Sequence, residues 1–311
     1  MRWFIEPGFW SSAPVQVALA IGGASAVVSA VVGVFTVLRG QSFAGHALTD
    51  VSTAGGSGAL LLGVSPIIGF VGLGIIGAGV MDAIGVRRLR GRDLATGIVL
   101  GASIGLAALI LYLDSTSRAT TGATQQILFG SIFTIQSSTV PVVVGFGVAA
   151  LALVTTLYRP LLLSTAGPEM AAARGVPERL VGVLFMAAMA VAVGLSSLTV
   201  GAILSTALLI GPAAAAIRLT RRIGWSLALA AVLGVAACWV GVLLAYDSYY
   251  WTSAHRAVPV SFFIVSLVFC FYLASGLGVR TRRHAAGRRA GPDPGTPVPG
   301  AGAATRRQAG A

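Results

Sequence analysis

The run VQVALAIGGASAVVSAVVGVFTVL, from Val15 to Leu38, contains no charged side chain and sets the class of the fold. A helix needs about 20 predominantly apolar residues to cross the hydrocarbon core of a bilayer, and this run is long enough. It lacks the small-residue cleavage pattern of a secretory signal, so we expect it to remain in the mature protein. The run is therefore predicted to be a transmembrane helix.

The same apolar composition continues along the chain. Of the 311 residues, 56% are hydrophobic and 10% are charged, and the mean hydropathy is +0.89. A soluble globular domain carries about 25% charged residues, so this chain has too little polar surface to face water on all sides. Because the deficit is spread over the whole length, we predict an all-α, polytopic integral membrane protein. Its nine predicted spans are residues 15–38, 43–63, 66–84, 94–113, 139–158, 179–195, 197–217, 225–246 and 257–278.

Small residues mark two of these spans. The second span begins with the polar stretch GHALTD and contains AGGSG, which indicates close packing against a neighbouring helix or a break. The fourth span carries a GxxxGxxxG face, Gly97, Gly101 and Gly105, that is predicted to pack helices tightly. Cys238 and Cys270 each lie inside an apolar run and are expected to be free thiols.

All 21 basic residues are arginines, and their distribution predicts the orientation of the chain. Cytoplasmic segments of membrane proteins carry an excess of Arg and Lys. With nine spans and a cytoplasmic C-terminus, the inner side receives Arg39, the cluster RRLRGR at 87–92 and the arginines of the tail, whereas the outer side receives Arg2, Arg118 and Arg256. Since the arginines lie at the ends of apolar runs and in the tail, the net charge of +12 does not predict binding to nucleic acid.

We therefore expect a multi-pass protein of the cell membrane with a transmembrane domain over residues 1–283. From residue 284 onward Gly, Pro, Ala and Arg predominate. This composition supplies no apolar core, so residues 284–311 are predicted to form a disordered cytoplasmic tail. The arginines of the tail can contact the headgroups of anionic membrane lipids.

Two ionisable side chains, His46 and Asp50, occur in the second span, four residues apart. That spacing puts them on one face of a helix, one turn from each other. Because ionisable groups are costly inside a bilayer, the pair is a candidate functional site. An imidazole and a carboxylate suit Zn²⁺, Mn²⁺ or Fe²⁺, and two ligands suit a transit site better than a closed structural site. The alternative is a hydrogen-bonded His–Asp pair that holds helix ends together.

Other polar residues near the spans have more ordinary interpretations. Asp82 and Asp93 flank the arginine-rich inner loop, and Asp93 is predicted to cap the N-terminus of its helix. Ser205 and Thr206 of the seventh span are candidates for lining a transport path. Hydroxyl groups in membrane helices also bond to backbone carbonyls or to neighbouring helices, and that alternative stays open.

No catalytic residue is predicted. The segment GGSG at 55–58 fits the short pattern of rhomboid-type intramembrane serine proteases, with Ser57 as nucleophile. Such a serine needs a base within hydrogen-bond reach, but His46 lies about three turns away on the same helix and His255 lies in an outer loop. A metalloprotease HExxH motif does not occur. A P-loop requires a lysine and the sequence contains none, so any ATPase is a separate subunit.

Several segments occur in the order and spacing of a known family. They are SFAGHALTDVSTAGGSGALLLG at 42–63, RGRDLATGIVLG at 90–101, LFGSIFTI at 128–135, LYRPLLL with GPEMAAARGV at 157–176, and SLTVGAILSTALLIGPAAAAIRLT at 197–220. With these segments the chain resembles the zinc/manganese-type ABC permeases, the membrane subunits of metal importers, from about Val15 to Arg283. The resemblance implies the ABC importer permease fold.

The resemblance also implies partners and a cargo. It implies a homodimer that encloses the path, two ATPase subunits on the cytoplasmic side and an extracytoplasmic metal-binding protein. Glu169, Ala173 and Gly175 match the acidic–Ala–Gly pattern of the segment that inserts into the ATPase. The family's second span commonly carries Asp and then His, whereas here His46 precedes Asp50. No tightly bound cofactor is implied. The divalent metal, zinc or manganese, is the substrate, and a His–carboxylate pair slightly favours zinc.

Two other functions stay open besides the protease. A related family with the same topology moves larger chelates such as siderophores or cobalamin, and such a cargo predicts a wider path and a tenth span. The second is an ATP-independent carrier.

Overall fold

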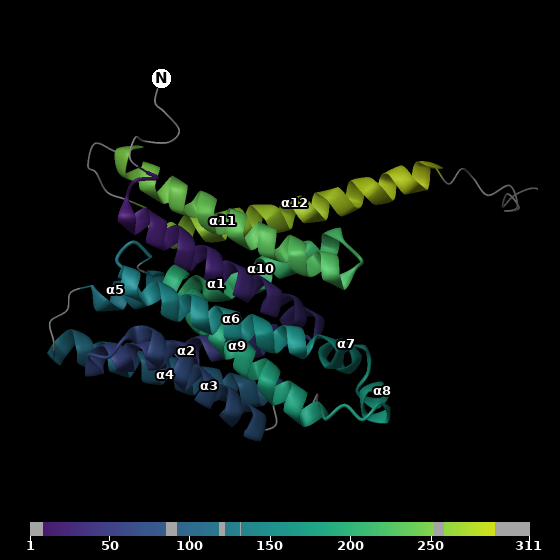
Figure 1. The fold of residues 1–311 in the computed structure, drawn as a ribbon, viewed down its shortest axis with the longest axis horizontal. Helices are drawn as coiled ribbons and strands as arrows, with labels where there is room; N and C mark the ends of the chain where they lie inside the picture. Colours follow the sequence, from purple (N-terminus) through teal and green to yellow (C-terminus); the bar gives the residue numbers. More distant parts are fainter. Residues whose placement is uncertain (1–8, 85–91, 118–121, 131, 252–257, 290–311) are drawn as a thin grey trace, which may run out of the picture.

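The computed structural model of the protein describes residues 9–84, 92–117, 122–130, 132–251 and 258–289 (Figure 1). In this part of the chain every regular element is helical. The long helices lie side by side in a bundle, and short helices lie at its two ends. This arrangement confirms the predicted all-α membrane fold.

Nine long helices of the described residues correspond to the nine predicted spans, with ends that differ by a few residues in most cases. Eight of them are long and apolar enough to cross a membrane, when the short turn before α6 is included. They are α1 (Ala13–Leu38), α3 (Pro66–Ile84), α4 (Arg92–Ser117), α6 (Val140–Thr156), α9 (Glu178–Val200), α10 (Ala202–Leu219), α11 (Ile223–Trp251) and α12 (Val260–Arg289).

The ninth helix, α2 (Ser42–Leu62), has 21 residues but is less apolar than the others. It contacts α3, α4, α9 and α10, and most of its residues are buried. A polar helix can lie at membrane depth when its polar groups face protein and not lipid. α2 meets that condition because the bundle encloses it.

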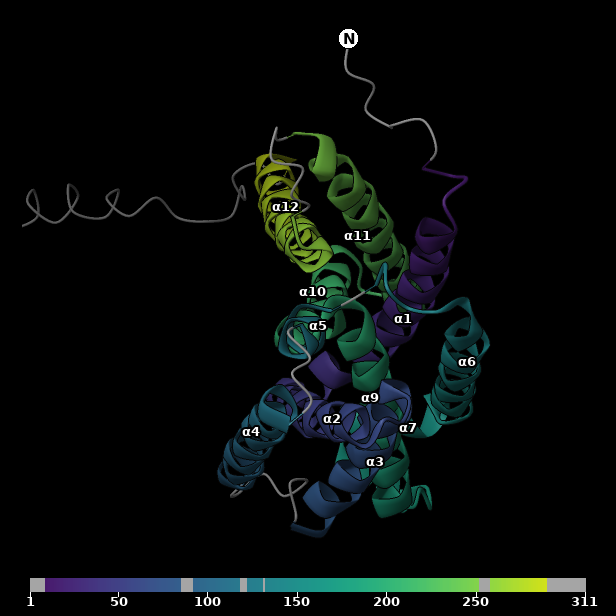
Figure 2. The same cartoon turned by 90° about the vertical axis from the view of Figure 1, so that its left-hand side faces the viewer.

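α9 lies at the centre of the bundle, where it contacts α1, α2, α3, α6 and α10. Figure 2 shows α2, α3 and α4 on one side of α9, and α1, α10, α11 and α12 on the other. Phe185 and Leu195 of α9 are fully buried in the main apolar core, together with Phe35 of α1 and Leu48 of α2. The core therefore joins the two groups of helices through α9.

The AGGSG segment packs closely and does not break α2. Gly55 faces Gly69 of α3, and a Cβ on either glycine would overlap the carbonyl oxygen of the other. Helices in lipid associate through such close approaches of small residues. Of the two interpretations of this segment, the structure therefore supports close packing.

The glycine face of α4 does not pack against another helix of the described chain. A Cβ at Gly97, Gly101 or Gly105 would meet no atom of another segment within 4 Å. α4 instead contacts α2 and buries Ala107 and Leu111. The GxxxGxxxG face therefore does not pack tightly within the described chain. Its tight packing stays a prediction for contact with a helix of another molecule.

Four short helices lie between the predicted spans: α5 (Ala123–Phe129), the 3₁₀ turn η1 (Ser137–Thr139), α7 (Tyr158–Ala166) and α8 (Pro168–Ala173). α5 lies at one end of the bundle, and α7 and α8 lie at the opposite end (Figure 1). We call these the α5 end and the α8 end.

α9 and α10 are separated at Gly201, so residues 197–200, predicted to begin the seventh span, belong to α9. The backbone of Gly201 contacts that of Gly130, which follows α5. Their φ angles are +91° and +78°, in the left-handed region that favours glycine. The break therefore occurs where two glycine backbones meet, which apolar periodicity does not reveal.

Several predicted features fall near the limits of the described chain. α12 ends at Arg289, so residues 284–289 of the predicted tail are helical, which suits their Ala and Arg content. Residues 290–311, most of the RRLRGR cluster, and Arg2, Arg118 and Arg256 lie outside the described residues. Asp93 lies in the first turn of α4. Cys238 and Cys270 are free thiols, as expected.

Candidate metal-transit site

His46 and Asp50 lie in the first half of α2, and both are half-buried. α2 follows α1 after a short turn, and the carbonyl of Gln41 accepts a hydrogen bond from the amide of Gly45. This start of the helix sets the register that puts both side chains on one face of α2, one turn apart.

The two side chains line a pocket of about 620 Å³ between α2, α4, α5 and α10. Hydroxyl groups of Thr53, Tyr112 and Ser115 belong to the same lining. An apolar wall with a few convergent polar groups is the usual form of a ligand pocket. The apolar residues of the lining are Ile104, Ala107, Ala108, Leu111, Leu128, Ala202 and Ile203.

One carboxylate oxygen of Asp50, Oδ2, is buried and has no hydrogen-bond partner among the described residues. An unsatisfied buried polar group costs about 1–3 kcal/mol, and a charged one costs more. Because Asp50 lines the pocket, a cation bound by its carboxylate would satisfy this oxygen. The orphaned atom is therefore the feature of the pocket that points most directly to a positively charged ligand.

His46 bonds to α10 and not to Asp50. Its Nδ1 lies 3.0 Å from Oγ1 of Thr206, which in turn lies 3.4 Å from Oγ1 of Thr49. The Oγ of Ser205 lies 3.5 Å from the same Thr49 oxygen. When Nδ1 carries the proton and donates it to Thr206, Nε2 keeps a lone pair for a metal. The alternative to a metal site, a direct His–Asp hydrogen bond, is not found between these two described residues, and Ser205 and Thr206 lie beside the pair.

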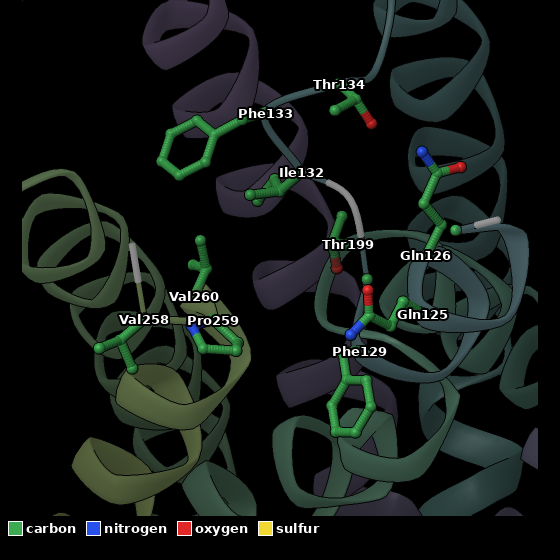
Figure 3. Close-up of a pocket in the computed structure, with 12 residues that line it drawn as sticks. Gln125, Gln126, Phe129, Ile132, Phe133, Thr134, Thr199, Val258, Pro259 and Val260 are labelled. Atoms are coloured by element: carbon green, nitrogen blue, oxygen red, sulfur yellow. The ribbon is translucent and has the colours of Figure 1, made fainter. Parts of the chain in front are cut away.

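A second pocket, of about 610 Å³, lies at the α5 end (Figure 3). Its lining includes the amides of Gln125 and Gln126 and the hydroxyls of Thr134 and Thr199, and none of the described residues that line it is charged. Leu128 of α5 lines the first pocket and the next residue, Phe129, lines the second. The last turn of α5 therefore lies between the two pockets.

Two buried carboxylates, Asp114 and Asp247, lie one residue beyond the predicted spans, which ended at residues 113 and 246. Asp114 of α4 is 2% exposed and Asp247 of α11 is 6% exposed, and each interacts with another residue. α4 and α11 continue to Ser117 and Trp251, so longer span boundaries would have included both. Neither lines the pocket of His46, and within the described residues no three His, Cys, Asp or Glu side chains lie close enough to hold a metal ion together.

The protease interpretation is not supported by the surroundings of Ser57. Its hydroxyl is buried and donates a hydrogen bond of 2.8 Å to the carbonyl of Thr53 on its own helix. His46 is bonded to Thr206, and His255 lies outside the described residues.

Asp82, predicted to be structural, is half-buried and interacts with another residue.

The segment that contains Glu169, Ala173 and Gly175 forms α8 and the turn after it. Glu169 lies in the first turn of α8 and Ala173 is its last residue. Gly175 follows with a φ of +72°, and its amide donates to the carbonyl of Ala172, so this glycine ends the helix. Glu169, Ala173 and Gly175 are all exposed. α8 therefore presents an accessible surface at the α8 end.

Residues 12–274, from α1 into α12, match the model of the ABC 3 transport family. The chain belongs to this family. It is therefore a multi-pass membrane protein of a transport system, and the resemblance inferred from its sequence segments is confirmed.

Proteins named for manganese or zinc transport are similar to this chain over most of its length. The manganese transport system membrane protein MntC of Halalkalibacterium halodurans is 31% identical over 256 residues, which cover 82% of this chain and 86% of that protein. The zinc transport system membrane protein TroC of Treponema pallidum is 31% identical over 66% of this chain and 71% of its own length.

A solved structure shows the same fold. A chain in the structure of PsaBC from Streptococcus pneumoniae in complex with Fab superposes with a TM-score of 0.73 and 26% identity. The match covers 86% of this chain and 92% of that chain. The bundle described above is therefore the fold of an experimentally determined relative.

Proposed function

We propose that the chain is the membrane-spanning permease subunit of an ABC importer that moves a divalent transition metal ion, zinc or manganese, into the cytoplasm. ATP hydrolysis takes place in a separate subunit. The observation that carries the proposal is the pair His46 and Asp50, one turn apart in a pocket, with Asp50 Oδ2 buried and without a hydrogen-bond partner among the described residues. The family match and the names of the relatives support the same function.

The ligand pair replaces part of the water that a cation loses in the membrane. A bare divalent ion in hydrocarbon costs tens of kcal/mol, so a transport path needs polar groups at membrane depth. Nε2 of His46 and the carboxylate of Asp50 supply two ligands, and the hydroxyls of Thr53, Tyr112 and Ser115 lie in the same lining. Because only two ligands of this kind bind the ion, its affinity for the site is low enough for the ion to be released.

The orientation of the proposed importer follows from its arginines. Arg39, Arg159, Arg174, Arg218 and Arg222 all lie near helix ends at the α8 end. An excess of arginine marks the cytoplasmic side, so we place the α8 end and the C-terminus in the cytoplasm. The α5 end then faces outward and receives the ion from an extracytoplasmic metal-binding protein.

The same orientation assigns the partners. α8, with Glu169, Ala173 and Gly175, lies on the side where the ATPase subunit binds, and its exposure suits insertion into a groove of that subunit. Two copies of the chain enclose the path. Ser205 and Thr206, the candidates for lining the path, are not part of the pocket lining, and Thr206 acts on the path through its contact with His46.

The choice between zinc and manganese depends on the donor atoms. A His–Asp pair by itself slightly favours zinc, whereas Mn²⁺ prefers more oxygen ligands. The pocket adds hydroxyl oxygens to the carboxylate. With these additional oxygen donors the site also suits Mn²⁺. We therefore propose that both ions are carried.

The proposal is tested by uptake into proteoliposomes that contain the complex of this chain with its ATPase and binding-protein partners. We expect ATP-dependent accumulation of radiolabelled free zinc and manganese. Accumulation of a radiolabelled, metal-free siderophore or cobalamin skeleton would favour a chelate permease, and metal uptake without ATP would favour a carrier. Either result would overturn the proposal.

The contact between His46 and Thr206 makes a separate prediction. Thr206→Val keeps the shape of the side chain but removes the oxygen that fixes the orientation of the imidazole. Partners of this kind are worth about 10- to 100-fold in metal affinity, so we expect uptake to fall about tenfold. Thr155→Val is the matched control, because Thr155 is exposed on α6 and bonds to the carbonyl of Ala152. Equal uptake by the two variants would show that the contact does not position His46.

A further inference from the structure

Arg39 links three elements at the α8 end of the bundle. It follows the last residue of α1 and is half-buried. Its Nη1 donates a hydrogen bond of 2.7 Å to Oγ of Ser164 on α7. Its guanidinium carbon also lies 5.4 Å from the centroid of the Phe185 ring on α9, within cation–π range. The Arg39 side chain therefore attaches α7 to both α1 and α9.

Aromatic contacts strengthen this attachment. Phe35 of α1 lies edge-to-face on Tyr158, the first residue of α7, with ring centroids 6.0 Å apart. It lies edge-to-face on Phe185 as well, at 6.4 Å. We call Phe35, Arg39, Tyr158, Ser164 and Phe185 the Arg39 junction. Because Phe35 and Phe185 are fully buried, the junction joins α7 to the apolar core.

The junction lies a few residues from the ligand pair on one side. After Arg39 only Gly40 and Gln41 precede α2, and the amide of Gln41 donates to the carbonyl of Thr36. His46 lies in the second turn of α2. A shift of Arg39 is therefore passed to the start of the helix that carries His46.

On its other side the junction lies next to α8. α7 ends at Ala166, and only Gly167 separates it from α8. The amide of Gly167 donates to the carbonyl of Leu163 in α7, its carbonyl accepts from the amide of Ala171 in α8, and the two short helices contact each other. A displacement of α8 therefore reaches Ser164, two residues before the end of α7.

We propose that Arg39 is a positioning residue that transmits movement of α7 and α8 to the start of α2 and so to His46. The inference rests on the proposed function, in which an ATPase subunit displaces α8. A charge-assisted hydrogen bond combined with a cation–π contact fixes the guanidinium in two directions. Without this contact α7 and α8 move while α2 stays in place, and ATP is hydrolysed without transport.

The test compares ATP hydrolysis and metal uptake in the same proteoliposomes, with the complete complex. For Arg39→Gln we expect hydrolysis close to the wild-type rate and at least about a tenfold fall in metal ions moved per ATP, within the usual range of coupling between sites. Arg39→Lys keeps a charge for the Phe185 ring, so we expect it to restore part of the ratio. Arg221→Gln is the matched control, because Arg221 is exposed in the turn between α10 and α11.

A second variant guards against a failure of Arg39→Gln to assemble. Ser164→Ala removes only the hydroxyl that Arg39 contacts, and we expect it to lower the ratio in the same direction. Because the two residues act through one contact, the double variant is expected to be no worse than Arg39→Gln alone.

The outcomes separate this inference from the proposed function. A wild-type complex without ATP-driven metal uptake overturns both. A coupled wild type with an unchanged uptake-to-ATP ratio in Arg39→Gln and Ser164→Ala overturns the role of Arg39 alone. A proportional fall of hydrolysis and uptake also overturns it, because that result shows a merely structural contact.

Discussion

Asp50→Asn is expected to reduce metal uptake at least about 100-fold, because loss of a direct ligand costs more than loss of a group that only orients one. The substitution keeps the size of the side chain but replaces the carboxylate with a neutral amide, so His46 remains the single strong ligand in the described lining of the pocket. Uptake of radiolabelled zinc and manganese by the reconstituted complex measures the effect.

Asp82→Asn is the matched control for this prediction. It makes the same chemical change at a half-buried carboxylate on α3 that does not line the pocket. The complex should keep its uptake with this variant. If the double variant His46→Ala, Asp50→Ala still took up both metals at the wild-type rate, the proposed path would be wrong.

Gly55→Leu is expected to destabilise the bundle by about 3 kcal/mol, the upper part of the usual range for overpacking. A side chain at Gly55 collides with the backbone of Gly69, which cannot move without displacing α3 from α2. The melting temperature of the purified protein in detergent, followed by thermal aggregation, should fall. Because α2 carries His46 and Asp50, metal uptake should fall with it.

Gly79→Leu provides the comparison. Gly79 lies on α3, is exposed, and a Cβ there would meet no atom of another segment within 4 Å. Both variants place the same apolar side chain on a membrane helix, so they differ mainly in the space available. Equal melting temperatures for Gly55→Leu and Gly79→Leu would show that the contact between α2 and α3 is less rigid than the structure indicates.

The spans were predictable because hydrophobicity is a local property. The runs that begin at Val15 and Pro66 each give a helix that starts within two residues of the predicted start. The weaker signal of α2 has a physical cause. Its polar residues face other helices and not lipid, so hydropathy underestimates a helix that the bundle encloses.

The candidate pair was predictable, but its surroundings were not. His46 and Asp50 are visible in the sequence as rare ionisable groups in an apolar chain. The bond from His46 to Thr206 joins residues 160 positions apart, and α4 contributes a wall of the pocket through Ala107 and Leu111. No periodicity within one helix specifies which face of a distant helix lies opposite.

Composition and spacing within single segments were enough to predict the membrane class, the order of the long helices in the described chain and His46 and Asp50 as candidate metal ligands. Only packing of the helices shows which small-residue segments contact each other within the chain, where α9 ends, and how α7 attaches to the bundle through Arg39. Those features depend on contacts between segments far apart in the chain, and such contacts form only when the helices pack together.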